Sequence, residues 1–404
     1  MSYAADLHIH SRYAIGTSRT LDFETLTRWA KIKGIDLLAS ADFTHPDWFR
    51  ETREKLAPSG DGLYEFGGVK FVLGTEVSSV SVQGGRSRRV HLLLFAPSVD
   101  VVEQINRALD RLGSLRSDGR PALKISCRDL VHLVLGIDVR CVVIPAHAWT
   151  PWFGVYGSKS GFDSLEECFG DAAGFIYAIE TGLSSEPAMN WRVPELDSRA
   201  IVSFSDAHSA PKLGRELTVF SGRPTYDGLV HALKTQAIDY TVEFFPQEGK
   251  YHLSGHRKCG VRRSPQEDAA GDGRCPVCGR PLTLGVAQRV ERLAGREVET
   301  WLDEDGFTRA DNGRPPFRML VGLQQVIAEA LGVGVGTKAV QARYRRLVAE
   351  LGNELAVLTR ASREEIARVS SQRIAEGVEL VRGGRIRIEP GYDGVYGSVS
   401  IWDR

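Results

Sequence analysis

The feature that most constrains this chain is the placement of its histidines and carboxylates, which recur at the ends of short β-rich runs across residues 1–244. His8 and His10 stand two residues apart, and side chains with that spacing leave the same face of a strand. Helical patterns separate the β-rich runs, and such alternation predicts a mostly parallel sheet, open or closed into a barrel. Because α/β barrels carry their chemistry at strand ends, we expect these groups to converge on one site.

Seven runs have the composition of strands, and four longer segments have the apolar spacing of helices. The predicted strands are Ala4–His10, Ile35–Asp42, Val69–Glu76, Val90–Phe95, Val142–His147, Phe175–Glu180 and Ile201–Asp206. The predicted helices are Asp22–Lys33, Val101–Leu112, Cys127–Leu135 and Tyr226–Lys234. The first helix also has end signals, because a capping residue precedes it and Gly34 follows it.

Imidazole and carboxylate groups together suit zinc, manganese or iron(II) better than calcium. The candidate metal ligands are His8, His10, Asp42, His45, Glu76, His91, His147, Asp206 and His208. These are too many for one ion, so we expect two or three divalent ions (Zn, Mn or Mg) that share Glu76. A lone histidine is more often structural, and His132 and His231, in predicted helices, are interpreted that way.

Residues 245–290 are rich in Gly, Pro, Cys and His and poor in apolar runs. Cys275-Pro-Val-Cys278 is a knuckle that points two thiolates at one ion. The segment lacks a core to fold around, so we expect one structural zinc ion to hold a small ribbon-like module. The expected zinc ligands are His256, Cys259, Cys275 and Cys278, with His252 as the alternative to His256.

The last third of the chain changes character twice. Residues 297–316 are acidic, with Gly and Pro, and predict a linker or long loop. A helical pattern runs from Phe317 to Glu379, and residues 386–397 predict a β-hairpin with a Pro-Gly turn. The net charge of the whole chain is zero, but residues 316–404 carry 13 Lys/Arg against 10 Asp/Glu, and residues 245–290 carry 8 against 4. Such small excesses suit phosphate contacts but also fit ordinary surface variation.

The sequence also indicates a location in the cell. No apolar run is long enough to span a bilayer, and the N-terminus lacks the basic-then-apolar pattern of a signal peptide. Cys127, Cys141 and Cys168 are scattered, as buried free thiols are. We therefore expect a cytoplasmic protein with no membrane partner.

Five short motifs occur in a fixed order along residues 6–208. They are Asp6-Leu-His-Ile-His-Ser, Ala41-Asp-Phe, Gly74-Thr-Glu, Pro145-Ala-His and Ser205-Asp-Ala-His. Together they resemble the motifs of the PHP superfamily, which implies a distorted (β/α)7 barrel and a trinuclear metal site that hydrolyses phosphoesters.

The resemblance also implies how the ligands are shared. One ion would be held by His8, His10, Glu76 and Asp206, and a second by Glu76, His91 and His147. His208 would help to hold a third ion. Phe43 stands where the superfamily has a histidine, so the third position is either rebuilt by Asp42 and His45 or weakly occupied.

Longer stretches resemble the endonuclease Q family and extend over nearly the whole chain. They are residues 42–48, 147–153, 157–163, 180–185, 249–252, 255–259, 336–338 and 390–397. This resemblance implies a DNA repair endonuclease that hydrolyses the phosphodiester 5′ to uracil, hypoxanthine, xanthine or an abasic site, leaving 3′-hydroxyl and 5′-phosphate ends. The partner would be double- or single-stranded DNA with damaged bases, and a sliding clamp is kept open as a further partner.

The implied organisation is a PHP metal-dependent phosphoesterase domain over residues 1–244 and a zinc-binding module over 245–290. A helical C-terminal DNA-binding region that ends in a β-hairpin would follow over 291–404. Glu76, Asp206 and His208 would be the catalytic residues. Two other functions stay open: a histidinol-phosphate-type small-molecule phosphatase, and a catalytically inactive PHP scaffold that binds DNA.

An aromatic stretch follows His147 directly and is a candidate for substrate binding. Its members are Trp149, Trp152, Phe153 and Tyr156. Aromatic residues in such a stretch either pack in the core or form the wall of a base pocket, and the sequence favours neither strongly. Lys159 and Arg192 are candidates for contacts with flanking phosphates.

Overall fold

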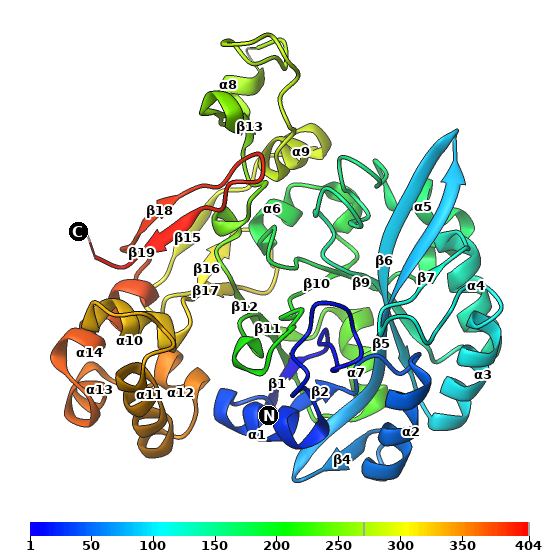
Figure 1. Cartoon of the computed structure of the whole chain (residues 1–404), viewed down its shortest axis with the longest axis horizontal. Helices are drawn as coiled ribbons and strands as arrows, with labels where there is room; N and C mark the ends of the chain where they lie inside the picture. The colour runs from blue at the N-terminus through cyan, green and yellow to red at the C-terminus, as the bar shows by residue number, and fades with distance from the viewer. Residues whose placement is uncertain (270, 403–404) are drawn as a thin grey trace.

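Seven strands form the barrel that the sequence predicted (Figure 1). The computed structural model describes residues 1–269 and 271–402. The barrel strands are β1 (Ser2–Asp6), β2 (Leu37–Ala39), β5 (Val69–Gln83), β6 (Arg86–Ala96), β8 (Val142–Pro145), β9 (Ala178–Glu180) and β10 (Ala200–Val202). Single backbone hydrogen bonds complete the ring, from Ala148 N to Glu180 O (2.9 Å) and from His10 N to Ala207 O (3.2 Å).

The strands are less uniformly parallel than the sequence predicted. β1 pairs in parallel with β2, and β2 in parallel with β5. β6, however, runs antiparallel to both β5 and β8. The cause is local, because Gly84 and Gly85 both have positive φ and turn the chain back directly from β5 into β6.

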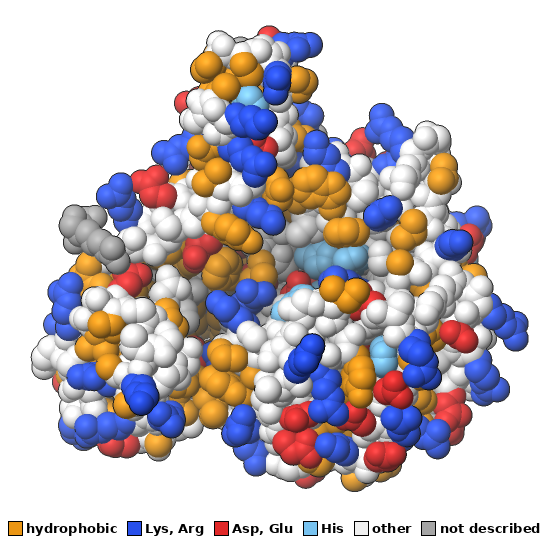
Figure 2. Space-filling model, viewed as in Figure 1, with side chains coloured by type: hydrophobic (Ala, Val, Ile, Leu, Met, Phe, Trp, Pro, Cys, Tyr) orange, Lys and Arg blue, Asp and Glu red, His pale blue; other side chains and the backbone are white. Residues whose placement is uncertain are grey.

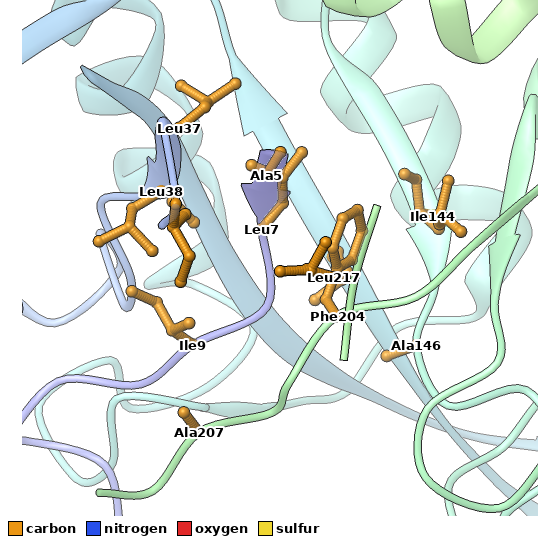
Figure 3. Close-up of a cluster of buried hydrophobic side chains, with 14 of the residues drawn as sticks. Ala5, Leu7, Ile9, Leu37, Leu38, Ile144, Ala146, Phe204, Ala207 and Leu217 are labelled. Carbon is orange, nitrogen blue, oxygen red and sulfur yellow. The ribbon is translucent and has the colours of Figure 1, made fainter. Parts of the chain in front are cut away.

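Side chains alternate between the core and the site along β1 and the extended residues that follow it, up to His10. Ala5, Leu7 and Ile9 are buried among apolar side chains (Figure 3). His8 and His10, at the alternate positions, leave the opposite face. The helices around the barrel are α1 (Phe23–Lys33), α2 (Pro46–Lys55), α3 (Val99–Leu109), α4 (Cys127–Ile137) and α7 (Tyr226–Thr235), with short helices α5 (Leu165–Phe169) and α6 (Pro187–Trp191) in the later loops.

The expected linker over residues 297–316 is instead part of the main sheet. β15 (Thr300–Leu302) and β16 (Thr308–Ala310) form a hairpin beside β17 (Phe317–Met319), and β17 pairs with β12 (Ile238–Glu243). β11 (Leu217–Ser221) then joins β12 to β1, while the small strands β3 (Ala57–Pro58), β4 (Tyr64–Phe66) and β7 (Ala122–Leu123) lie on the side of β5. Three-residue strands are too short to show an alternating pattern, which is why the sequence did not reveal them.

The C-terminal region is helical and ends in a hairpin, as predicted. Its helices are α10 (Leu323–Leu331), α11 (Lys338–Leu351), α12 (Glu354–Thr359), α13 (Arg363–Val369) and α14 (Gln372–Arg382). β18 (Arg387–Glu389) and β19 (Ser398–Ser400) form the hairpin. Its connection is not the predicted tight Pro-Gly turn but an eight-residue loop over 390–397, held by hydrogen bonds from Gly391 N to Gln247 O and from Gly394 N to Lys250 O (both 2.8 Å).

The cysteine-containing segment projects from the body of the molecule (Figure 1). Its elements are β13 (Ser254–His256), β14 (Val261–Arg263), α8 (Pro265–Ala269) and α9 (Val286–Leu293). β13 and β14 pair antiparallel, and α9 leads the chain back toward the barrel. Among the described residues, no helix has both the length and the apolar character needed to cross a membrane.

Candidate metal centre

Two groups of potential metal ligands meet inside the barrel. The first consists of His8, His10, Glu76 and Asp206, and the second of Glu76, His91 and His147. Within each group the ligand atoms lie within 4.8 Å of one another. Glu76 belongs to both groups, and its two oxygens are divided between them: Oε2 lies 3.2 Å from His10 Nε2, and Oε1 lies 2.6 Å from His91 Nδ1. This carboxylate is therefore placed to bridge two ions.

The backbone at this site adopts conformations that side chains usually avoid. His147 and Asp206 both have positive φ, at 31° and 46°. Residues outside glycine rarely occupy that region, and such strain persists where the surrounding structure fixes the side chain for function. The two residues stand just beyond the ends of β8 and β10, so their side chains turn into the site.

His8 has the tautomer that a metal ligand requires. Its Nδ1 lies 2.9 Å from Glu180 Oε1, where it donates a hydrogen bond, and this leaves the Nε2 lone pair facing the group. His8 Nε2 is buried and has no hydrogen-bond partner among the described residues. A buried imidazole nitrogen without a hydrogen bond is costly, and carboxylate oxygens of Glu76 and Asp206 lie 3.2 and 3.5 Å from it, so the residues fit a bound cation at this point.

The carboxylates of Glu76 and Asp206 stay ionised although burial opposes their ionisation. Burial opposes ionisation of Glu76, but the imidazoles of His91 and His8 outweigh it and hold the pKa of Glu76 well below its usual value. Asp206 behaves similarly, since burial is outweighed by His8 and His10 and its pKa is lowered. Both carboxylates therefore present anionic oxygens, the form that binds metal ions.

A cavity of about 560 Å³ opens directly on these ligands. His147 and Asp206 lie in its wall, together with residues from the later loops such as Leu183 and Tyr251. In Figure 2, histidine atoms show at the centre of this face, among hydrophobic and Lys or Arg side chains. The metal-ligand groups are thus buried in the protein but accessible through a pocket large enough for a small organic group.

The second cluster lies in the projecting segment. His256, Cys259, Cys275 and Cys278 have ligand atoms within 4.8 Å of one another, and Cys278 Sγ lies 3.4 Å from His256 Nδ1. His252 is not part of the group; it is buried and lines the cavity beside the barrel. Three thiolates and one imidazole in this arrangement match a tetrahedral structural zinc site.

Known proteins resemble this chain over nearly its whole length. The model of the MJ0043 C-terminal domain matches residues 322–385. The uncharacterised protein MJ0043 of Methanocaldococcus jannaschii is 32% identical over 263 residues, which are 63% of this chain but only 31% of that protein. The lesion-specific endonuclease PfuEndoQ of Pyrococcus furiosus is 31% identical, with a TM-score of 0.86 over 99% of this chain and 95% of that one. The chain belongs to the endonuclease Q family.

A second solved structure agrees with this assignment. Endonuclease Q in complex with a 27-mer duplex that carries an abasic lesion at the active site is 31% identical, with a TM-score of 0.85. The alignment covers 100% of this chain and 97% of that one. Two sequence predictions are thereby confirmed: the endonuclease Q resemblance and the enzyme class, a metal-dependent endonuclease.

The sequence offered Asp42, His45 and His208 for a third ion. Among the described residues, these three side chains do not form a ligand group. Both oxygens of Asp42 are occupied, one by His10 Nδ1 (3.0 Å) and the other by Ser11 N (2.6 Å). The ring of His45 stacks on Tyr13 at 4.4 Å, and His208 Nδ1 lies 2.9 Å from Asp206 O. Asp42 therefore orients His10 rather than presenting free oxygens to an ion.

The predicted aromatic wall is only partly at the surface. Trp149 and Tyr156 are 1% and 0% exposed, so they pack in the core; the indole N–H of Trp149 donates to Asn190 Oδ1 (2.7 Å) and the Tyr156 hydroxyl to Glu195 Oε1 (2.8 Å). Phe153 stacks on His91 at 4.4 Å. Trp152 alone of the four is well exposed, at 41%, and packs edge-on against Tyr251 at 5.1 Å.

The two predicted phosphate contacts also differ in their surroundings. Arg192 forms ion pairs with Glu291 and Glu297, at 2.9 and 2.8 Å. Lys159 lies on the loop after β8, where its backbone N–H donates to Pro151 O (2.9 Å). Arg192 is therefore a structural ion-pair residue in this arrangement.

Two residues of the site were not identified from the sequence. Glu180, at the end of β9, accepts from His8 and also from the backbone N–H of His147 (2.6 Å). Arg120 donates from Nη1 to Glu76 Oε2 (3.3 Å). The signals for Glu180 were its position at a predicted strand end and its place at the start of residues 180–185, one of the stretches that resemble the endonuclease Q family; for Arg120 the sequence offered none.

Proposed function

We propose that this chain cuts DNA at damaged nucleotides, hydrolysing the phosphodiester on the 5′ side of uracil, hypoxanthine, xanthine or an abasic site. The observation that carries the proposal is that His147 and Asp206 belong both to the ligand groups and to the wall of the cavity. The reacting phosphate and an adjacent small group would thus be bound side by side. A related endonuclease Q has been solved with an abasic duplex at its active site.

The chemistry requires charge at the phosphate and a position for the attacking water. Two divalent ions, when bound, would lower the pKa of a water and offset charge on the phosphoryl oxygens. The chain's contribution is to fix the geometry: Glu76 joins the two ligand groups, and Glu180 and Asp42 orient His8 and His10. Asp206 completes the first group from the segment after β10, which lies beside His10. The products would carry 3′-hydroxyl and 5′-phosphate ends.

The cavity supports recognition of a nucleotide that has left the base stack. An enzyme that inspects a base in a duplex must extrude it, and weakened pairing at a deaminated base lowers that cost. The volume of about 560 Å³ lies in the range of pockets that enclose small ligands. Leu183, Phe244 and Tyr251 supply apolar surface in its wall, and Trp152 contacts Tyr251 beside it. An abasic site would enter because it presents no base to reject.

We further propose that residues outside the barrel hold the duplex. The projecting module, residues 245–290, carries eight Lys or Arg against four Asp or Glu. One structural zinc ion on His256 and the three cysteines would fold it, and the helical region over 291–404 would contact DNA beside it. Neighbouring phosphates are the expected contacts of such cations.

The two other candidate functions explain less of the molecule. A small-molecule phosphatase would need the ligand groups and the cavity, but not the projecting module or the helical region. A DNA-binding scaffold would need the projecting module and the helical region. It would not need the shared carboxylate of Glu76 or the strained backbone at His147 and Asp206. A nuclease accounts for all of these features together.

One incubation separates the three functions. Labelled duplexes that contain uracil, hypoxanthine, xanthine or no damage are incubated with the enzyme and Mg²⁺, Mn²⁺ or Zn²⁺, and p-nitrophenyl phosphate is assayed in parallel. We expect nicking of the damaged duplexes and slow release of nitrophenol. Fast nitrophenol release without nicking would favour the phosphatase, and tight binding without either reaction would favour the scaffold.

A further inference from the structure

Arg120 places a guanidinium group beside the shared metal ligand. It lies in the loop between α3 and β7, and its Nη1 is 3.3 Å from Glu76 Oε2. The side chain is 25% exposed, so part of it is accessible to solvent, whereas Glu76 is buried. Its charge also acts on Asp206, a ligand of the first group.

The loop that carries Arg120 is fastened to three other parts of the barrel. Gly119 N donates to Tyr13 O (3.0 Å), in the loop after β1, and Thr44 Oγ1 donates to Gly119 O (3.2 Å), in the loop after β2. On the other side of Arg120, Ser78 N on β5 donates to Pro121 O (2.9 Å). The position of Arg120 is therefore set by the same strands that position the metal ligands.

A close approach at Gly119 shows how tightly this loop is packed. A Cβ atom at residue 119 would lie 2.5 Å from Asp42 Oδ2, a contact that real side chains do not make. Asp42 is the residue that orients His10. The loop can reach Glu76 only because a glycine passes Asp42, and this places Arg120 with little freedom before any substrate arrives.

Most of the donors of Arg120 are available. A guanidinium has five N–H groups in a planar fork that matches phosphate oxygens. Within residues 1–269 and 271–402, Glu76 is the one acceptor of its side chain. Glu76 takes one of these donors, so the other N–H groups of the guanidinium have no acceptor among the described residues and are free to bind a phosphate.

The side chains of Asp42, His45 and His208 do not form a third ligand group among the described residues, although His45 Nδ1 is buried without a hydrogen-bond partner and His208 is bonded only through Nδ1, to Asp206 O. A phosphodiester being cleaved gains negative charge on its non-bridging oxygens, and a fixed cation there stabilises the transition state. Arg120 supplies such a fixed positive charge beside the two ligand groups.

We propose that Arg120 is a catalytic residue that binds a non-bridging oxygen of the scissile phosphate and stabilises the negative charge that develops there. This inference rests on the proposed nuclease function and assigns the residue that contacts the phosphate during it. It also explains why the loop is fastened so closely to the strands that carry the ligands.

The first test compares Arg120→Gln with Arg116→Gln. Arg116 lies in the same loop, but it pairs with Asp47 at the surface and its side chain is 69% exposed. With saturating metal, we expect the single-turnover cleavage rate of Arg120→Gln to fall by about 10²–10³-fold, the usual effect of removing one oxyanion-stabilising donor. Arg116→Gln should cleave at the wild-type rate, and both variants should retain the wild-type metal content. Arg120→Lys, which keeps the charge but not the fork, should fall between.

The second test measures binding and needs no turnover. The Asp206→Asn variant is compared with the double variant that also carries Arg120→Gln, and the affinity of each is measured for a lesion duplex with a normal phosphate or an uncharged methylphosphonate at the scissile position. We expect Arg120→Gln to weaken binding of the phosphate duplex about tenfold and to leave binding of the methylphosphonate duplex unchanged.

The outcomes separate failure of this inference from failure of the proposed function. Cleavage by Arg120→Gln at the wild-type rate with saturating metal would overturn the inference, and so would equal binding losses on both duplexes. A loss of activity restored by added metal would also overturn it, because Arg120 would then serve only to hold the ions. Wild-type enzyme that binds but never nicks damaged duplex would instead overturn the function.

Discussion

Glu180 holds His8 in the orientation that directs its free nitrogen into the metal-ligand group, with Oε1 of Glu180 2.9 Å from Nδ1 of His8. The same carboxylate accepts the backbone N–H of His147, so one buried residue positions a member of each group. The two contacts join β1, β9 and the end of β8. Glu180 is therefore a positioning residue for the whole centre.

Substitution of Glu180 tests that role. We expect Glu180→Ala to lower the affinity for active-site metal by about 10–100-fold, the usual effect of losing a partner that orients a ligating histidine. Metal titration followed by elemental analysis measures this. Glu195→Ala is the control, because Glu195 accepts from the Tyr156 hydroxyl away from the ligand groups. Equal metal binding by Glu180→Ala and wild type would show that the orientation of His8 does not matter.

The sequence predicted which residues gather at the centre better than it predicted their partners. His8 and His10 were recognisable from their spacing, and Glu76, His147 and Asp206 from the ends of predicted strands, although β5 continues past Glu76 to Gln83. Glu180 lies 172 residues from His8, and Arg120 lies 44 from Glu76, so no local pattern connects them. These contacts depend on how the barrel closes, which periodicity does not specify.

Asp42 and Trp149 show a second limit of the sequence. Both stand beside ligand-rich motifs: Asp42 was a candidate ligand, and Trp149 was interpreted equally as core packing or as part of a pocket wall. Asp42 is instead committed to His10 and Ser11, and Trp149 donates into the core at Asn190. A motif fixes residue order, but the local backbone decides which way each side chain points; Asp42, for example, has a positive φ of 32°.

The zinc cluster gives a prediction about folding. We expect Cys275→Ser to lose one tightly bound zinc ion per chain and to increase hydrogen exchange across residues 249–285, because metal binding supplies the folding energy of such a module. His256→Ala should lose the same ion. The control is Cys141→Ala, outside the cluster, which should keep it. Retention of zinc by His256→Ala and loss by His252→Ala would show that the fourth ligand is His252.

Glu243 gives a prediction about pH. This side chain is buried on β12, where it accepts from the hydroxyls of Ser203, Thr241 and Thr181, and burial raises its pKa to about 8. The folded chain thus binds this proton more tightly than the unfolded chain does, so the contribution to stability is present in acid and is lost as the pH rises through about 8. We expect the free energy of unfolding to fall by roughly 1 kcal/mol between pH 7 and pH 9 from this group. Denaturant unfolding of Glu243→Gln should lack that part of the decline, and identical pH slopes would refute the assignment.

Trp152 tests whether the cavity receives a base. If its ring contacts an extruded base, Trp152→Ala should reduce cleavage at uracil by about tenfold or more, in line with the usual value of one stacking contact. Cleavage at an abasic site should change much less. Trp301 is a suitable control, because it is 48% exposed on β15, outside the lining of the cavity. Equal losses on both lesions would make Trp152 a packing residue.

The most direct test of the nuclease account is to map one cut at nucleotide resolution. A duplex with a single abasic site and a 5′ label on the damaged strand is incubated with wild-type enzyme and with Glu76→Gln. We expect one labelled product that ends in a 3′-hydroxyl immediately 5′ to the lesion, and a rate lower by on the order of 10³-fold with Glu76→Gln, since the bridging carboxylate is lost. Cuts at other positions, equal cutting of undamaged duplex, or near wild-type cleavage by Glu76→Gln would contradict the account.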